Sequence, residues 1–432
     1  MNPLLLVGVD VLGTGVRDLG VVEGRLVDPT SPQGARLDWA RVDCAGLVAL
    51  PALVDPHTHL RDPGPGDAET IASGSVAAAR GGYGAVFAMA NTVPVADTVE
   101  VVEYEKRRGD EVGLVDVHPV GAVTLGLGGE TLADIRGMAD SAAEVRMFSD
   151  DGKCVARSDV MRDALRVIGE VGGVLAQHAQ DPLLTVGAQI DAGVAERVGL
   201  PGWPTMAESV IVARDVLMAA ELGTRLHVCH VSTAATIGVI RWAKSQGFGV
   251  TAEVTPHHLT LDHDRAAGGD PLFKVNPPLR SAADIEACRE ALADGTLDTV
   301  GTDHAPHPPG SKEADWCDAS MGMLGLETAL AIVADTLVAP GRMTWADVAQ
   351  RMSTAPAALI GIEDEHGGDL SPGRPASLCL VDPSRGWTVA GSELASIASN
   401  TPYEGLAYRA RVVATLLRGA VTADLDGRFG AA

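Results

Sequence analysis

The chain has 432 residues, of which 46% are hydrophobic, and this suffices for one large domain and a smaller one with a substantial core. Its 33 basic and 57 acidic residues give a formal net charge of −24, which argues against nucleic acid and against an anionic membrane surface as partners. The six cysteines are scattered without a CxxC motif, a pattern typical of reduced thiols in a cytoplasmic protein.

The two ends of the chain share a β-rich composition. Residues 1–52 contain segments such as LLLVGVDVLG and VRDLGVVEGRLVDP, punctuated by Gly and Pro, and residues 365–432 contain PASLCLVDP and ARVVATLLRGAVT. We therefore expect both ends to form one small β-sandwich domain around a middle domain of residues 53–364. The opening MNPLLLVGVD lacks a basic region and a long apolar stretch, so we expect no signal peptide.

The middle of the chain alternates apolar β-rich runs with helical patterns. This alternation predicts a parallel sheet, and eight repeats predict an α/β fold of the (β/α)8 TIM-like barrel type. Helical patterns include residues 69–80, 159–170, 207–222, 234–246 and 282–293. The β-rich runs are residues 47–54, 84–89, 115–122, 144–148, 173–176, 225–229, 249–254 and 297–300. Residues 324–339 are also apolar, but they include two acidic residues and predict a buried or amphipathic helix rather than a membrane span.

The first β-rich run leads into DPHTHLRDPG, which places His57 and His59 two residues apart. In a strand, such side chains point to the same face about 7 Å apart, so two imidazoles can share one metal ion. Arg61 is the next residue on that face and is positioned for an anionic group. Taken alone, an HxH pair is equally compatible with two ordinary surface or core histidines.

Polar groups end nearly every predicted strand, and this favours the metal interpretation because such barrels carry their active sites at the carboxyl ends of their strands. Nitrogen and oxygen ligands without cysteine suit Zn²⁺, with Mn²⁺ or Co²⁺ as alternatives. The polar groups are His57, His59, Asn91, Asp150, Asp151, His178, His230, His257, His258 and Asp303.

Simpler structural roles remain open for several of these residues. Asp303 could cap a strand, Asn91 could stabilise a turn, and His307 could be a solvated loop residue. Asp150 is expected to be structural rather than a ligand. We expect His257, His258 and His304 to be packed beside the ligands. Cys229 precedes His230 on the same strand, so strand alternation predicts that it faces a helix.

The motifs as a set resemble the amidohydrolase superfamily and, within it, class I dihydroorotases. The likeness runs along almost the whole chain, and the set is specific although each piece alone would be weak. The motifs are DPHTHLRDPG, GGYGAVFAMANTVP, FSDDGKCV, HAQD, HVCHVST, EVTPHHL, KVNPPLR, VGTDHAPH and SNTPYEG.

The resemblance implies a centre that holds one or two Zn²⁺ ions. One metal would be bound by His57, His59 and Asp303, and the other by His178 and His230. Many relatives bridge the metals with a carboxylated lysine, but here the SDDG pattern aligns Asp151 with that place, as in the Asp-type class I dihydroorotases. Lys153 is the alternative, since strand alternation could put it on the same side as Asp151.

The resemblance also assigns the substrate contacts. Arg61 and Asn91 would hold a substrate carboxylate, His307 would complete that clamp, and His59 would lie against the substrate. Asn276 would contact a pyrimidine ring, as would the backbone of Met321-Gly322, which stands where relatives often have Phe-Gly. Ala52, Ala90 and Ser377 depart from the usual residues of the family, and these differences affect loop shape more than chemistry.

The implied activity is that of a dihydroorotase, which interconverts N-carbamoyl-L-aspartate and L-dihydroorotate in pyrimidine synthesis. Metal-bound hydroxide would attack the ring amide carbonyl, with Asp303 as general acid and base. An allantoinase or hydantoinase is the enzymatic alternative, and a non-catalytic scaffold for aspartate transcarbamoylase is the other. Partners left open are a homodimer and aspartate transcarbamoylase. The polar residues 308–320 are expected to form a mobile lid.

Overall fold

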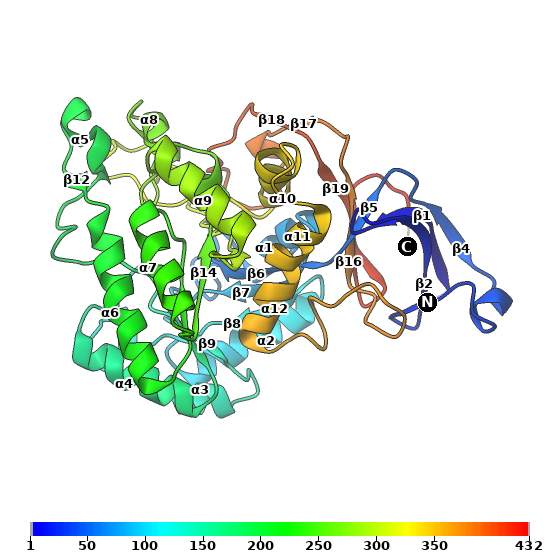
Figure 1. The fold of residues 1–432 in the computed structure, drawn as a ribbon, viewed down its shortest axis with the longest axis horizontal. Helices are drawn as coiled ribbons and strands as arrows, with labels where there is room; N and C mark the ends of the chain where they lie inside the picture. Colours follow the sequence, from blue (N-terminus) through cyan, green and yellow to red (C-terminus); the bar gives the residue numbers. More distant parts are fainter. Residues whose placement is uncertain (1–2, 431–432) are drawn as a thin grey trace.

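Eight parallel strands form the barrel in the computed structural model, which describes residues 3–430 (Figure 1). Five of them pair in the order β15-β14-β13-β10-β9 and three in the order β6-β7-β8. Parallel bridges from Gly121 to Phe148 and from Thr58 to His304 join the two sheets, so the barrel closes. The strands are β6 (Leu53–Thr58), β7 (Tyr83–Ala88), β8 (Asp116–Pro119), β9 (Met147–Phe148), β10 (Val174–Gln177), β13 (Leu226–Val228), β14 (Val250–Val254) and β15 (Thr299–Val300).

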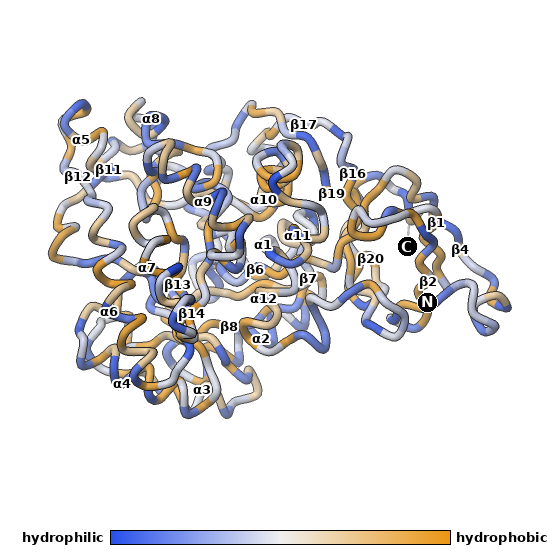
Figure 2. Tube along the Cα trace, viewed as in Figure 1, coloured by the Kyte–Doolittle hydropathy of each residue, from blue (hydrophilic) through white to orange (hydrophobic). Residues whose placement is uncertain are grey.

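Helices follow the strands and cover the barrel on the outside (Figure 1). Hydrophilic and hydrophobic residues alternate along α4 in Figure 2, and its buried residues recur with helical spacing. The helices are α1 (Ile71–Arg80), α2 (Val99–Val112), α3 (Ile135–Asp140), α4 (Ser158–Glu170), α5 (Ala192–Val198), α6 (Met206–Leu222), α7 (Ala234–Ser245), α8 (His263–Ala266), α9 (Ala282–Asp294), α10 (Ala329–Val333), α11 (Trp345–Ala349) and α12 (Ala355–Ile360).

Side-chain caps fix several helix starts at the barrel mouth. Thr70 forms a capping box with Ser73 before α1, and Thr233 accepts a hydrogen bond from the backbone N–H of Thr236 in α7. The apolar residues 324–339 contain α10 and a π-helical turn, Ala334–Val338. Among the described residues, no helix is both long and apolar enough to cross a membrane.

A second sheet combines strands from both ends of the chain, as predicted, and lies on the right in Figure 1. Its order is β20-β19-β16-β5-β1-β2-β3, with β4 paired to β1. It encloses its own apolar core, which includes Leu6, Leu378 and Leu416. The strands are β1 (Leu4–Val11), β2 (Val16–Val22), β3 (Arg25–Val27), β4 (Ala40–Asp43), β5 (Val48–Pro51), β16 (Leu378–Asp382), β19 (Arg411–Leu417) and β20 (Ala420–Asp424). The predicted barrel with a small β domain is therefore confirmed, while the boundaries at residues 52 and 364 stay a prediction.

The first predicted strand, residues 47–54, is two strands in different sheets. β5 pairs with β1 and β16 in the terminal sheet, whereas β6 pairs with β7 in the barrel. Residues between Val48 and Val54 are all buried, so hydrophobicity runs on across the point where the chain changes sheets. Two short strand pairs complete the fold, β11 (Ile190–Asp191) with β12 (Gly202–Trp203) and β17 (Trp387–Thr388) with β18 (Ala407–Tyr408).

Candidate metal centre and substrate pocket

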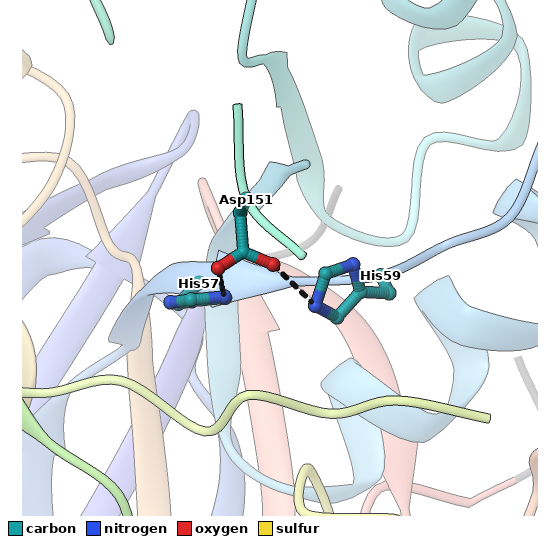
Figure 3. A group of neighbouring side chains, drawn as sticks. All are labelled: His57, His59 and Asp151. Atoms are coloured by element: carbon teal, nitrogen blue, oxygen red, sulfur yellow. Dashed lines mark ion pairs between the residues drawn. The ribbon is translucent and has the colours of Figure 1, made fainter. Parts of the chain in front are cut away.

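His57 and His59 lie at the carboxyl end of β6 and are both buried. His57 Nδ1 donates a hydrogen bond to Glu253 at 2.6 Å, and His59 Nδ1 donates to Asn91 Oδ1 at 2.8 Å. These bonds turn both Nε2 atoms toward Asp151. The carboxylate of Asp151 spans the pair, with one oxygen 3.5 Å from His57 Nε2 and the other 3.3 Å from His59 Nε2 (Figure 3).

Asp151 also faces the second predicted pair of histidines. Its Oδ1 atom lies 3.2 Å from His178 Nδ1 and 3.3 Å from His230 Nε2, and these two nitrogens are 2.8 Å apart. One carboxylate therefore stands between two pairs of histidines, which is the place of a bridging ligand. Lys153, the alternative bridge, is exposed at the wall of the neighbouring cavity.

Asp303 follows β15 and reaches the same cluster. Its Oδ1 atom lies 3.1 Å from His59 Nε2 and 3.6 Å from His57 Nε2. Asp303, Arg61 and His230 have φ values of 47°, 56° and 32°, in the left-handed region that non-glycine residues rarely adopt. Backbone strain of this kind concentrates at functional sites because the surrounding structure must hold it. Each of these three predicted site residues therefore has a strained backbone conformation.

The electrostatics of the cluster favour a cation. Burial raises the pKa of Asp303, but the hydrogen bond from His59 and the charge of His57 lower it to about 2. Burial lowers the pKa of His57, but Asp151 and Glu253 outweigh this effect and hold that pKa well above its usual value. The buried carboxylates therefore favour positive charge within the group.

The donor set fits a divalent ion. Ligand atoms of His57, His59 and Asp151 lie within 4.8 Å of one another, and so do those of Asp151, His178 and His230. His57 Nε2 is buried and has no hydrogen-bond partner among the described residues. Buried imidazole nitrogens that converge on one carboxylate and on each other are expected where a metal binds.

Glu253, on β14, is a functional residue that sequence reasoning missed. It accepts hydrogen bonds from His57 Nδ1, from His227 Nε2 at 3.2 Å and from the backbone N–H of His230 at 3.1 Å. A carboxylate bonded to the far nitrogen of a metal-binding histidine fixes the tautomer and orientation of the ring. The available signal was a charged residue inside the apolar run 249–254.

Cys229 lies beside this group, so the prediction that it faces a helix was wrong. Its Sγ atom lies within 4.8 Å of ligand atoms of His57 and Glu253, inside the barrel. The strand β13 ends at Val228, and His230 has a positive φ. Strand alternation therefore no longer determines which way these side chains point.

The predicted carboxylate clamp is partly assembled. Arg61 Nη1 donates to Asn91 Oδ1 at 3.3 Å, and its Nε atom donates to the carbonyl of Pro306. His307 donates from Nε2 to the carbonyl of Met321 at 2.7 Å. Burial, and then the charge of Arg61, lower the pKa of His307 to about 4, so the ring is neutral near pH 7. A bound carboxylate would favour the protonated ring, which can donate from both nitrogens.

The predicted ring contacts line a cavity of about 660 Å³ beside the cluster, which includes Asn276 and Met321. Asn276 Nδ2 donates to Gln180 Oε1 at 3.0 Å, and the same oxygen accepts from His178 Nε2 at 2.9 Å. Asn276 Oδ1 is buried without a partner among the described residues, so it can accept a hydrogen bond from a ligand. Gln180 was missed, although it lies in the HAQD motif.

Asn400, in the SNTPYEG motif, was also missed as a site residue. Its side chain accepts a hydrogen bond from the backbone of His307 at 3.2 Å and donates to the carbonyl of Gly322 at 3.3 Å. It thereby connects the clamp with the backbone that is predicted to face the ring.

The contacts of Asp150 are those of a structural residue, because its carboxylate accepts hydrogen bonds from the backbone N–H groups of Val123 and Thr124.

Comparison with known sequences shows similarity to dihydroorotases over nearly the whole chain. A family model described as Dihydro-orotase-like matches residues 46–236. A dihydroorotase of Mycobacterium leprae is 53% identical over 425 residues, which cover 97% of this chain and 98% of that protein. A dihydroorotase of Streptomyces coelicolor is 51% identical over 434 residues, which cover 99% and 100%.

Solved structures of similar fold include an L-hydantoinase (dihydropyrimidinase) from Arthrobacter aurescens. It is 26% identical in sequence with a TM-score of 0.87, and the match covers 98% of this chain and 96% of that chain. A dihydropyrimidinase from Brevibacillus agri is 22% identical with a TM-score of 0.83, covering 98% and 95%. Both barrel and terminal sheet are therefore shared with these proteins.

Proposed function

The chain belongs to the dihydroorotase family, and we infer that it catalyses the reversible cyclisation of N-carbamoyl-L-aspartate to L-dihydroorotate in pyrimidine synthesis. Identity of 51% to 53% with dihydroorotases over nearly the full chain is the observation that carries this conclusion. The chain is accordingly a hydrolase of a cyclic amide with a small-molecule substrate. We propose that it works in the cytoplasm.

We propose that one or two Zn²⁺ ions occupy the centre, with Mn²⁺ or Co²⁺ as alternatives. His57, His59 and Asp303 would bind one ion, His178 and His230 the other, and Asp151 would bridge them. The distances around Asp151 support this arrangement. When bound, such ions lower the pKa of a coordinated water and polarise a substrate carbonyl.

Asp303 is the proposed general acid and base. In the hydrolytic direction its carboxylate would accept a proton from the attacking water and pass it to the leaving ring nitrogen. In the reverse direction it would take the proton from the attacking carbamoyl nitrogen. The low pKa of Asp303 keeps it ionised near neutral pH, so it begins the hydrolytic direction in the accepting form.

The remaining predicted residues would orient the substrate. Arg61, Asn91 and His307 would hold the ring carboxylate, and His59 would lie against the substrate. Asn276 and the backbone of Met321 and Gly322 would face the ring. Fixing the carboxylate and the ring together places the amide carbonyl at the metal centre before reaction, which lowers the entropic part of the barrier. The cavity beside the centre supports this arrangement.

Turnover of L-dihydroorotate by the zinc-supplied protein tests this function, with allantoin and a 5-substituted hydantoin assayed alongside. Turnover of dihydroorotate alone would support the family activity together with the carboxylate clamp. Preference for another ring would favour the allantoinase or hydantoinase alternative. Loss of all three activities with metal bound would favour a scaffold that acts with a partner, for which aspartate transcarbamoylase and a second copy of the chain are the candidates.

A further inference from the structure

Two buried lysines join the 308–320 segment to the substrate pocket. Lys274 precedes Asn276 by two residues, and Lys312 lies within the segment itself. Their exposed fractions are 3% and 9%. The chain has only five lysines, and a charged amine is costly to remove from water, so the burial of two of them in one place needs an explanation.

The two side chains reach in opposite directions. The Lys274 amine donates to three carbonyls of the segment, those of Trp316 at 2.5 Å, Cys317 at 3.2 Å and Ala319 at 2.9 Å. The Lys312 amine returns to the other side and donates to the carbonyls of Pro271 at 3.0 Å and Lys274 at 2.7 Å. The segment around Lys274 thus supplies an amine to the carbonyls of residues 316–319, and Lys312 supplies one to the carbonyls of residues 271 and 274.

These hydrogen bonds extend to the predicted ring contacts. The carbonyl of Lys274, which accepts from Lys312, also accepts from the backbone N–H of Gly322 at 3.0 Å. Met321, which precedes Gly322, receives the hydrogen bond of His307. Release of the two amines would therefore loosen the segment and weaken one support of the backbone that is predicted to face the ring.

We propose that Lys274 and Lys312 are positioning residues that fasten the 308–320 segment and thereby hold Met321, Gly322 and Asn276 in place for the substrate. This inference rests on the proposed function for the identity of the substrate. The sequence predicts the segment to be a mobile lid, whereas the two lysines fasten it to the wall of the pocket. Opening it requires breaking five amine–carbonyl hydrogen bonds.

Lysine reactivity tests the fastening in the unmodified, metal-loaded protein. Brief treatment with an amine-reactive reagent followed by mass spectrometry should label the exposed Lys153 at least about tenfold faster than Lys274 or Lys312. Burial, and then the charge of Lys274, lower the pKa of Lys312 to about 7 in the folded protein, so slow labelling of Lys312 near neutral pH would report inaccessibility rather than protonation of the amine. Labelling of all three at similar rates in the folded protein would overturn the proposal.

Substitutions test the positioning role. Lys312→Met should raise KM for L-dihydroorotate about tenfold while kcat changes less than about threefold, because the lost contacts serve binding geometry. Chymotrypsin should cleave after Trp316 faster, and Lys274 should gain reactivity. Lys312→Arg should recover most of the affinity. Lys106→Met is the matched control and should change none of these, because Lys106 is half-buried on α2, where it pairs with Asp110.

The outcomes separate this proposal from the proposed function. Unchanged KM, cleavage and labelling in a folded Lys312→Met protein would overturn the positioning role, as would equal losses in kcat and metal content. If Lys312→Met did not fold, the reactivity of the native lysines would still decide the fastening. A wild-type protein without dihydroorotate turnover would contradict the proposed function, while slow labelling of Lys274 and Lys312 would still support the fastening.

Discussion

Two groups of histidines and carboxylates lie at opposite ends of the barrel strands, and they differ in the partners of their central carboxylates. At the carboxyl ends, Asp151 stands among histidine nitrogens, and His57 Nε2 has no partner among the described residues. At the amino ends, Asp116 on β8 accepts from His366 at 2.7 Å and from both terminal nitrogens of Arg418 at 2.6 and 2.8 Å. Both oxygens of Asp116 are therefore occupied.

The two ends also have cavities of similar size but different linings. The cavity at the amino ends holds about 620 Å³ and contains Arg146 and Arg225. Arg146 donates to the carbonyls of Ala139 and Val145, and Arg225 to that of Leu359. Its cations are committed to the protein, whereas the cavity of about 660 Å³ at the other end is lined by Asn276, whose Oδ1 acceptor has no partner among the described residues. His118 Nε2, which lines the cavity at the amino ends, also has no partner among the described residues. The carboxyl ends are therefore distinguished by the convergence of several histidine nitrogens on one carboxylate, not by cavity volume or a single unpaired atom.

The largest contrast is expected from removing one carboxylate at each end. Asp151→Asn should lose tightly bound metal and lower kcat about 10³-fold or more, since the bridging oxygen is lost. Asp116→Asn should keep metal and turnover, and should lower the free energy of unfolding by about 1–3 kcal/mol because an amide replaces the carboxylate that accepts from both Arg418 and His366. Elemental analysis, turnover of L-dihydroorotate and urea unfolding measure these effects. Retained metal in Asp151→Asn would contradict the bridging assignment.

A second contrast compares arginines. Arg61→Ala should raise KM for L-dihydroorotate about 10²-fold while metal content is unchanged, because a charge-assisted contact to the substrate carboxylate is lost. Arg418→Ala at the other end should leave KM unchanged. Titration of the metal and steady-state kinetics on both variants give the answer. Equal loss of metal and substrate binding in Arg61→Ala would mean that Arg61 is structural.

A third prediction concerns the orientation of His57. Glu253→Gln should weaken Zn²⁺ binding about 10- to 100-fold, since the amide cannot hold the ring as the carboxylate does. Competition with a chelator of known affinity measures this change. Glu105→Gln is the control, because Glu105 is a buried carboxyl group on α2 whose pKa is raised well above its usual value by burial. A similar weakening in both variants would indicate a general loss of packing.

Local patterns predicted the barrel well, and long-range contacts explain what they missed. The expected helix 207–222 is α6, Met206–Leu222, because helical spacing and turn residues are local signals. The run 47–54 was misread because burial does not tell which sheet a strand joins. Likewise, the sequence indicated the histidines through the HxH spacing, whereas the charged Glu253 inside an apolar run gave no sign of its partner His57, which is 196 residues away.

The sequence also failed to indicate which charged and polar side chains are buried. Lysine is normally a surface residue, so the sequence predicts that Lys274 and Lys312 are exposed. Only the folded chain shows that carbonyl oxygens surround their amines. Asn400 and Gln180 lie in motifs that indicated the family, yet their partners come from other strands and loops. Sequence reasoning therefore found the groups that would touch metal and substrate more readily than the groups that hold those residues in place.

The smallest expected effect is a pH dependence at the amino ends of the strands. His118 stacks on Phe87 with ring centroids 4.8 Å apart, and burial, followed by the charge of His366, lowers its pKa to about 4. The folded protein therefore resists protonation of His118, whereas the unfolded chain takes up that proton near pH 6.5. The stability contributed by neutral His118 is present above pH 6.5 and is lost as the pH falls toward 4.

Between pH 7 and pH 5, urea unfolding should show the free energy of unfolding fall by about 1–2 kcal/mol. His118→Phe should remove this fall, with the metal centre intact in both proteins. An identical loss in His118→Phe would assign the acid sensitivity to other groups, including the histidines of the metal centre.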